Sequence, residues 1–410
     1  CVGGLCSFLF TYIAGKCSKV ILDTGRLTLI ISKVMRHSNY MGVFYALLQA
    51  GLWEKDVQLL QYGRIDFKEV IQLAEEQSVV GLVTAGLEHV IDAKVPHDKL
   101  VPFIGRTLQI EQRNKAMNDF IAKLINLLNE NGIKALLVKG QGVAQCYERP
   151  LWRACGDVDL LLDDENYRKS KEVLIPLASA VEPEDVANKH QGMHIKDFVL
   201  ELHGRMPFSM SKKVDHEIDN IITDSLSNGC VKIWENNDTE VLLPANYNHL
   251  ILVFTHFLSH FFIEGVGLRQ ICDWCRLLWT YRSEIDLKQL KKCINRMGLN
   301  SEWKAFGTFA VHYLGIPIEA MPLLINGDSI KFKNKAKKIN DFIMMSGNFG
   351  HNRDLSYRIK YKGIVYKLVS FCRRLKDFVY LTKIFPLNSP KFFFTYIAGK
   401  CSKVILAGKG

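Results

Sequence analysis

The hydrophobic residues in the first third of the chain recur at the spacing of an α-helix. After Pro96, apolar side chains repeat every three or four residues until just before Gly132, a residue type that commonly follows a helix end. This stripe consists of Met117, Phe120, Ile121, Leu124, Leu127 and Leu128. A second stripe follows Asp66, which opens an Asp-x-x-Glu sequence typical of a helix N-terminus. The spacing therefore predicts a helical domain over residues 39–132.

The pattern then changes from helical to alternating. A mainly apolar run at 133–138 leads into a glycine-containing turn, and residues 156–162 and 197–205 alternate apolar with polar side chains. Alternation with a period of two predicts half-buried strands, because successive side chains of a strand point to opposite faces. Helical spacing at 165–175 separates the two alternating stretches. We therefore expect a small mixed sheet with helices in residues 133–240.

Helical spacing returns after residue 240. The stretch 241–263 has no Asp, Glu, Lys or Arg, but its proline, two asparagines and three histidines favour a buried helix over a membrane span. We predict no transmembrane segment, a second helical domain at 241–330, and a basic, aromatic segment at 331–410. The fold class predicted for the whole chain is α+β, a small mixed-sheet core flanked by N- and C-terminal helical domains.

The cysteines and charges add constraints on the compartment and the partners. The 410 residues include 11 cysteines, an odd number without framework spacing, which favours a reduced, cytoplasmic protein over a disulfide scaffold. The net charge is +11, yet residues 331–410 alone hold 18 Lys and Arg against three Asp, so the rest of the chain is net acidic. Such a tail suits nucleic acid or an anionic membrane surface, and a solvated helical face explains it equally well.

One peptide occurs twice in the chain. The sequence FTYIAGKCSKVIL at residues 10–22 recurs letter for letter at residues 394–406. Two copies at opposite ends do not make a repeat protein, because repeat folds need tandem units. We therefore interpret residues 1–38 as a doubtful N-terminal extension and assign no function to them.

Two aspartates on one predicted strand give the strongest chemical signal. Asp157 and Asp159 share a strand face, where their like charges repel each other unless a cation lies between them. Glu201 lies on the polar face of the other alternating strand, and it completes a three-carboxylate metal site if the two strands are neighbours. Lys139 and Gly140 precede the aspartates in a strand-to-helix turn, whose N–H groups and positive charge suit a phosphate.

Ligand-type side chains after residue 240 offer a rival metal site. They are His249, His256, His260, Cys272 and Cys275. The histidines share one helical face, as a zinc hydrolase would require, but core histidines are the favoured interpretation because no third ligand is evident nearby. The cysteines form a lone Cys-x-x-Cys without the second pair that a zinc site needs. In the same region, Arg269 and Asp273 are predicted to pair across one helical turn.

A series of short motifs runs in a fixed order through the middle of the chain. They are Leu137-Val138-Lys139-Gly140, Tyr147, Arg153, Gly156-Asp157-Val158-Asp159-Leu160-Leu161 and Glu201-Leu202-His203. On these motifs the chain resembles the nucleotidyltransferase-like family of the DNA polymerase beta superfamily, in particular its bacterial branch labelled uncharacterised nucleotidyltransferase. The resemblance covers about residues 50–320 and implies a nucleotidyltransferase core at 133–240.

The resemblance implies an activity and its residues. The reaction is a Mg²⁺-dependent (or Mn²⁺-dependent) transfer of a nucleoside monophosphate from an NTP such as ATP to the hydroxyl of an unidentified small molecule or protein. The implied roles are catalysis and metal binding for Asp157, Asp159 and Glu201, and phosphate binding for Lys139, Gly140 and Arg153. The alternative is a catalytically silent binding module of the same fold, whose basic tail docks onto nucleic acid or a membrane surface.

Overall fold

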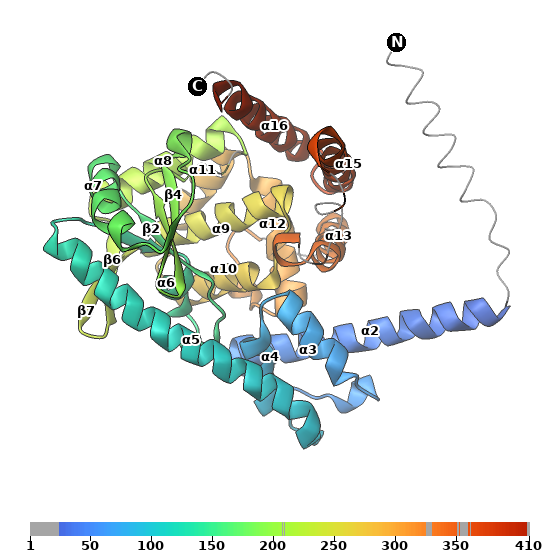
Figure 1. The fold of residues 1–410 in the computed structure, drawn as a ribbon. Helices are drawn as coiled ribbons and strands as arrows, with labels where there is room; N and C mark the ends of the chain where they lie inside the picture. The colour runs from blue at the N-terminus through green and yellow to red at the C-terminus, as the bar shows by residue number, and fades with distance from the viewer. Residues whose placement is uncertain are drawn as a thin grey trace, which may run out of the picture.

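The structure of the chain is a computed structural model that describes residues 24–206, 208, 210–324, 330–350, 352, 360 and 362–407. Helices surround a mixed five-stranded sheet and a separate two-stranded sheet (Figure 1). This arrangement confirms the predicted α+β class. None of the helices in the described ranges has the length and apolar character needed to cross a membrane. The first copy of the repeated peptide lies outside the described residues.

Four helices precede the larger sheet. They are α2 (Thr24–Trp53), α3 (Phe67–Glu76), α4 (Val80–Glu88) and α5 (His97–Glu130). Helix α3 begins where predicted, because the Asp66 carboxylate accepts a hydrogen bond from the backbone N–H of Lys68. Helix α5 is the predicted long helix after Pro96, and Figure 1 shows it running from α4 to the sheet. It therefore connects the N-terminal helices with the strands that carry the candidate site.

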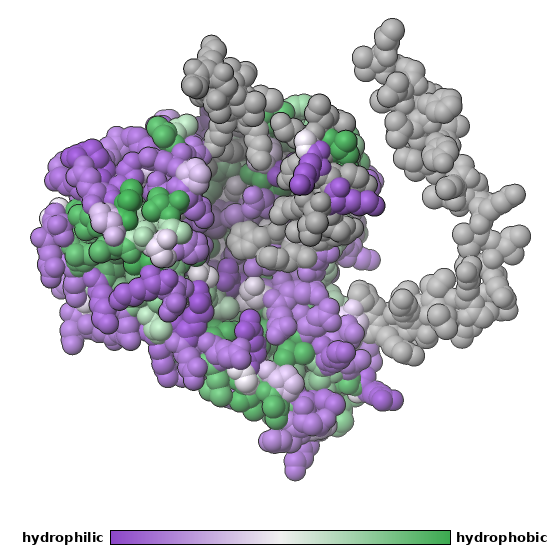
Figure 2. Space-filling view, viewed as in Figure 1, coloured by the Kyte–Doolittle hydropathy of each residue, from purple (hydrophilic) through white to green (hydrophobic). Residues whose placement is uncertain are grey.

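The first turns of α5 have one buried and one exposed side. On the buried side, the Thr107 hydroxyl donates to Thr84 Oγ1 of α4 at 2.8 Å. On the exposed side, Val101, Ile104 and Leu108 follow one another at three- and four-residue spacing. Figure 2 shows hydrophobic side chains gathered over α4 and this end of α5, and a second hydrophobic group on the left of the same face.

The crossing of α2 and α4 depends on two glycines, and it gives a first prediction. A Cβ atom on Gly86 would lie 1.9 Å from the carbonyl oxygen of Leu47, and one on Gly51 would lie 1.8 Å from that of Leu82. Gly86→Ala is therefore expected to force the helices apart and to lower the free energy of unfolding by about 3 kcal/mol, measured by urea unfolding. Gly105→Ala in α5 is the control, because an added Cβ there meets open space. A Gly86→Ala midpoint equal to that of the control would contradict this packing.

The five-stranded sheet has the order β1-β2-β5-β4-β3. Its strands are β1 (Leu136–Val138), β2 (Asp157–Leu161), β3 (Ala180–Val181), β4 (His190–Ile195) and β5 (Phe198–His203). β2 and β5 run parallel, and the other neighbours are antiparallel. The two strands predicted from alternation are thus adjacent, and the edges of the sheet are strands of only three and two residues.

The connections around the sheet are partly as predicted. Helix α7 (Asp164–Leu174) follows β2, and the Asp163 carboxylate accepts the N–H of Asn166 at its start. The two-stranded sheet of β6 (Val231–Asn236) and β7 (Thr239–Pro244) turns at Asn237 and Asp238, which both have positive φ, as tight hairpins require. The sequence pattern did not predict β3, β4, β6 or β7, because these strands lack a clear apolar and polar alternation.

One face of the sheet is buried against α5 and α7. The even-numbered residues of the two central strands lie in this core, each at most 6% exposed: Val158, Leu160, Phe198, Leu200 and Leu202. Successive side chains of a strand point to opposite faces. The odd-numbered residues, Asp159 and Glu201 among them, therefore lie on the other face of the sheet.

Helices also follow the sheet. They are α8 (Lys212–Ser227), α9 (Asn246–Ile263), α10 (Leu268–Thr280), α11 (Leu287–Met297), α12 (Asn300–Phe309), α13 (Ile330–Ser346), α15 (Gly363–Thr382) and α16 (Asn388–Ala407). Helix α9 occupies residues 246–263 of the stretch 241–263 predicted to be a buried helix, and most of its side chains are buried, whereas residues 241–244 belong to β7. It lies between α10 and the C-terminal helices in Figure 1.

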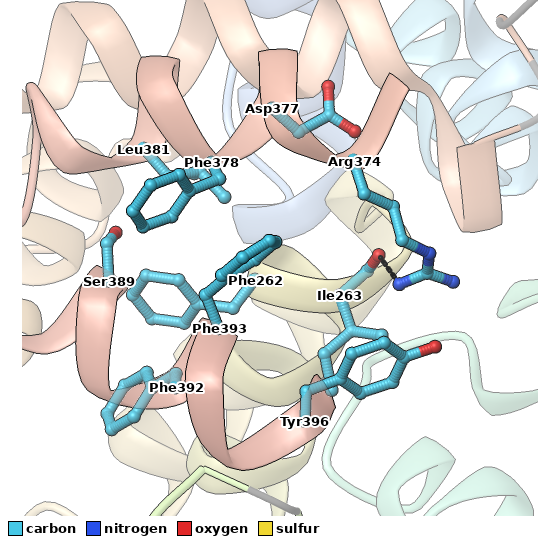
Figure 3. Close-up of a pocket in the computed structure, with 10 residues that line it drawn as sticks. All are labelled: Phe262, Ile263, Arg374, Asp377, Phe378, Leu381, Ser389, Phe392, Phe393 and Tyr396. Atoms are coloured by element: carbon cyan, nitrogen blue, oxygen red, sulfur yellow. Dashed lines mark hydrogen bonds between the residues drawn. The ribbon is translucent and has the colours of Figure 1, made fainter. Parts of the chain in front are cut away.

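Several aromatic side chains of the basic C-terminal segment pack against α9, whereas Phe371 and Phe394 are exposed. Figure 3 shows Phe378 of α15 and Phe392 and Phe393 of α16 gathered around Phe262 of α9. The ring centroids are 4.4 Å apart for Phe378 and Phe393, and 4.9 Å apart for Phe262 and Phe392. Only about 20 Å³ of space remains between these side chains. These helices are therefore a packed end of the molecule that covers α9.

Candidate functional site

The parallel pairing of β2 with β5 brings the three predicted carboxylates together. The register places Asp159 opposite Glu201, and Asp157 lies two residues before Asp159 on the same face. One ligand oxygen from each of the three residues lies within 4.8 Å of the others. Val138 at the end of β1 is opposite Asp159, so the turn after β1 begins beside this cluster.

Lys139 occupies that turn, between β1 and α6 (Gly140–Ala144). Its φ is 61°, in a region that side-chain-bearing residues rarely adopt, and its Nζ lies 2.8 Å from Asp159 Oδ1. Burial alone would lower the pKa of the Lys139 ammonium, but the charges of Asp159, Asp157 and Glu201 outweigh burial and raise that pKa. The ammonium group is therefore charged, and it neutralises one part of the acidic cluster.

Positively charged and hydrogen-bonding neighbours stabilise the three carboxylates to different extents. Burial would raise the pKa of Asp159, but Lys139 and His203, whose Nε2 lies 2.9 Å from Asp159 Oδ1, outweigh burial and lower it. Burial likewise opposes ionisation of Glu201, and contacts with His190 and His203 outweigh it. Asp157 differs from both, because the Asp159 charge and then burial raise its pKa. Asp157 is thus the carboxylate with the greatest need for an additional cation.

A small cavity of about 40 Å³ opens beside the cluster. Its walls come from the turn after β1, from β2, and from helices α9 and α10. The lining residues are Lys139, Gly140, Arg153, Asp157, Asp159, Val253, His256, Arg269, Gln270 and Asp273. Six residues were predicted to bind metal or phosphate, and all of them except Glu201 line this cavity. The structure therefore gathers these five residues around one cavity.

Arg153 and Asp273 form a buried ion pair in the wall of this cavity. Arg153 Nη2 donates to Asp273 Oδ2 at 2.6 Å, and Nε donates to Oδ1 at 3.0 Å. The Tyr147 hydroxyl also donates to Asp273, at 2.7 Å. The predicted pairing of Arg269 with Asp273 is therefore wrong. Arg269 instead donates to the carbonyl of Ala154 at 2.8 Å, because this loop lies closer to it than its own helix neighbour does, and its buried Nε has no hydrogen-bond partner.

The sequence was compared with known protein families, curated proteins and solved structures. The family described as uncharacterised nucleotidyltransferase matches residues 63–315, more than half of the chain. The chain belongs to this family. No curated protein and no solved structure matches it. Membership in this nucleotidyltransferase family supports nucleotidyl transfer as the general class of activity.

The donor atoms of the three-carboxylate cluster suit a hard divalent cation. Mg²⁺ is bound through carboxylate oxygens, and Asp157, Asp159 and Glu201 supply three of them within one cluster. The raised pKa of Asp157, which its Asp159 neighbour causes first and burial second, shows that the cluster lacks positive charge at this point. These residues therefore fit a metal site of the kind that nucleotidyltransferases use.

The sequence analysis did not assign two histidines that lie beside the carboxylate cluster. His203 lies on the same strand face as Glu201, two residues later, and this alternation is visible in the sequence. His190 pairs with His203 across β4 and β5, and its ring centroid lies 4.8 Å from that of His203. The position of His190 depends on β4, a strand that the pattern did not predict. Only the structure therefore places it beside the carboxylates.

The rival zinc ligands do not come together as a set. Among the described residues, groups of three or more ligating side chains occur at Asp157, Asp159 and Glu201, and at His190, Glu201 and His203. His249 is buried in α9, and burial lowers its pKa to about 4. Cys272 and Cys275 are buried, unpaired thiols of α10. The structure thus favours core roles for His249, Cys272 and Cys275 over a zinc site, and it places His256 in the wall of the cavity beside the carboxylates.

The surroundings of His203 predict how the stability of the metal-free protein depends on pH. Burial would lower the pKa of His203, but its contacts with Asp159 and Glu201 outweigh burial and raise it above the ordinary value of 6.5. A raised pKa contributes stability below the unfolded value, and this stability is lost as the pH rises through the folded value. The urea midpoint measured in EDTA is therefore expected to fall as the pH rises above 6.5, the unfolded value. His203→Gln should flatten this decline, and an equally steep decline in that variant would contradict the assignment.

Proposed function

We propose that the chain transfers a nucleoside monophosphate from an NTP to an acceptor hydroxyl with the help of Mg²⁺ or Mn²⁺. The acceptor hydroxyl oxygen attacks the α-phosphorus and gives up its proton to solvent, while the bond from that phosphorus to the bridging oxygen breaks and its electron pair leaves with pyrophosphate. The observation that supports this most is the cluster of Asp157, Asp159 and Glu201 beside a charged lysine, in a chain of a nucleotidyltransferase family. The proposal leaves the base of the NTP and the acceptor open.

Asp157 and Asp159 are the proposed ligands of the catalytic cation. When bound, a divalent ion neutralises charge that develops on the phosphate oxygens. We assign Glu201 to cation binding as well, and not to deprotonation of the acceptor. An efficient base has a pKa near the working pH, whereas contacts with His190 and His203 outweigh burial and hold the pKa of Glu201 well below its usual range.

The triphosphate is proposed to bind in the cavity beside the turn after β1. Lys139 supplies a charged ammonium there, and Gly140 lets the chain turn with a φ of 43°. Of the two arginines in the wall, Arg153 already binds Asp273 with two nitrogens, whereas Arg269 has a buried Nε without a partner. We therefore assign a phosphate contact to Arg269, and to Arg153 the positioning of α10 next to β2.

An assay with labelled nucleotides tests the proposal. Each of the four NTPs, labelled at the α-phosphate, is incubated with the full chain, Mg²⁺ and a cellular extract that supplies acceptors. Transfer of the label to a product, with release of pyrophosphate, is the expected result. Calorimetry provides the second measurement, because NTP binding should require Mg²⁺. Absence of Mg²⁺-dependent binding of all four NTPs would sink the proposal.

A further inference from the structure

Two imidazole rings converge on the same carboxylate oxygen at the outer side of the acidic cluster. His190 Nε2 lies 3.3 Å and His203 Nε2 lies 3.5 Å from Glu201 Oε2. The three ligand atoms lie within 4.8 Å of one another. The cluster of His190, Glu201 and His203 shares only Glu201 with the cluster that contains the aspartates.

The strand register builds this second cluster. His190 of β4 is directly opposite His203 of β5, and Glu201 lies two residues before His203 on the same face. The residue opposite Glu201 is Gly192, and the Glu182 carboxylate lies over this glycine, 2.7 Å from where a Cβ atom of residue 192 would be. His190 and Glu201 remain about one-third exposed, at 32% and 30%, so an ion can reach them from solvent.

The distances between the three ligand atoms are compatible with coordination of one ion. Charge-assisted hydrogen bonds from nitrogen to a carboxylate are usually about 2.7–2.9 Å long. Ligand atoms that each lie about 2.1 Å from a common ion are roughly 3.0–3.4 Å apart. The two imidazole contacts of Glu201, at 3.3 and 3.5 Å, are close to the second range. In the metal-free protein His203 Nε2 also lies 2.9 Å from Asp159 Oδ1, so binding an ion would release the proton from this nitrogen and replace that hydrogen bond.

The ligand types indicate which ion belongs there. Imidazole nitrogens suit transition-metal dications such as Fe²⁺, Ni²⁺ and Zn²⁺, whereas Mg²⁺ is bound through oxygen ligands. We propose that His190, His203 and Glu201 form a second cation site that selects a transition-metal dication over Mg²⁺. The inference deepens the proposed function, on which it rests for the role of the neighbouring aspartates. Glu201 then links an oxygen-rich site with a nitrogen-rich one.

Metal binding without nucleotide tests the second site. The full chain is stripped with EDTA and titrated with Mn²⁺ in a large excess of Mg²⁺, and bound Mn²⁺ is counted by electron paramagnetic resonance. Wild type should retain one Mn²⁺ that Mg²⁺ does not displace, and pulsed measurements should show coupling to imidazole nitrogen. His190→Gln should weaken this binding by more than about tenfold, because glutamine keeps a hydrogen bond but lacks the imidazole ligand. His194→Gln is the matched control, an exposed histidine on the same strand outside both clusters.

Different results of these measurements would refute the second cation site and the proposed function. If Mg²⁺ displaces all Mn²⁺ from wild type, or if His190→Gln binds Mn²⁺ as tightly as His194→Gln, the imidazoles act only through hydrogen bonds and the second site is refuted. Asp157→Asn should keep the nitrogen-coupled Mn²⁺, because Asp157 belongs only to the other cluster. Mn²⁺ binding that depends on His190, in a protein without NTP transfer, would refute the proposed function and leave the second site standing.

Discussion

An Asp157→Asn variant should lose Mg²⁺-dependent nucleotidyl transfer by at least about 10³-fold, because a bound divalent ion supplies several kcal/mol of transition-state stabilisation. The same variant should be more stable than wild type when metal is absent. The Asp159 charge, followed by burial, raises the pKa of Asp157, so the neutral amide removes a repulsion on the order of 1 kcal/mol. The rate of label transfer in Mg²⁺ and the urea midpoint in EDTA measure the two effects.

The combination of lost activity and gained stability distinguishes a cation ligand from a folding residue. Asp197→Asn is the control, since Asp197 is an exposed carboxylate between β4 and β5 outside both ligand clusters. It should retain wild-type transfer. If Asp157→Asn were active, or if it were less stable than wild type in EDTA, the proposed role of Asp157 would be wrong.

Loss of the Arg153 side chain should cause the largest change in stability. Arg153 and Asp273 are 5% and 4% exposed, and Arg153→Met leaves the Asp273 carboxylate buried without its cation. Removal of one partner of a buried pair costs about 3–5 kcal/mol. We therefore expect the urea midpoint of the Arg153→Met variant to fall clearly. NTP transfer should fall with it, because the pair holds α10 next to the strand that carries Asp157.

A double variant separates the lost charge from the lost packing. Arg153→Met combined with Asp273→Asn removes both charges and leaves an acceptor for the Tyr147 hydroxyl. It should recover much of the stability that the single variant loses. Arg168→Met, which breaks the exposed pair with Glu172, should leave the midpoint nearly unchanged. An Arg153→Met midpoint as high as that of Arg168→Met would show that the buried pair does not stabilise the fold.

The sequence predicted the strands of the candidate site better than their surroundings. Alternation is a local property, so it identified the strands of Asp159 and Glu201 and the faces on which these residues lie. Whether the two strands are neighbours depends on tertiary structure. The sequence analysis therefore predicted the three-carboxylate site only on the condition that they are. His190 was missed because β4 contains a glycine and polar residues on both faces, which hides its strand character.

The partner of Asp273 was mispredicted for a different reason. The rule for residues four apart on a helix favoured Arg269, but it ignores what packs against the helix. In the structure the loop before β2 approaches α10, so Arg153 reaches Asp273 and Arg269 reaches the backbone of Ala154. Contacts between segments more than a hundred residues apart decide both pairs, and no local pattern encodes them.

The composition of the basic C-terminal segment did not decide between a partner-binding tail and a packed helical end. Its charge suited a nucleic-acid or membrane partner as well as a solvated helix, and its phenylalanines were equally ambiguous. The structure buries Phe385 and Phe392 against the rest of the chain, at 1% and 4% exposure. Truncation at residue 330 would therefore uncover part of the core around α9, and it would report on folding as well as on any partner.

The short edge strands of the five-stranded sheet restrict how an acceptor can be recognised. Many proteins bind an extended peptide as an additional strand, which requires a long run of unpaired backbone groups at a sheet edge. Here the edges are β1 and β3, with three and two residues. Neither offers enough backbone to template a bound peptide. A protein acceptor would therefore have to present its hydroxyl on a folded surface or a loop, and its recognition would depend on side chains around the cavity.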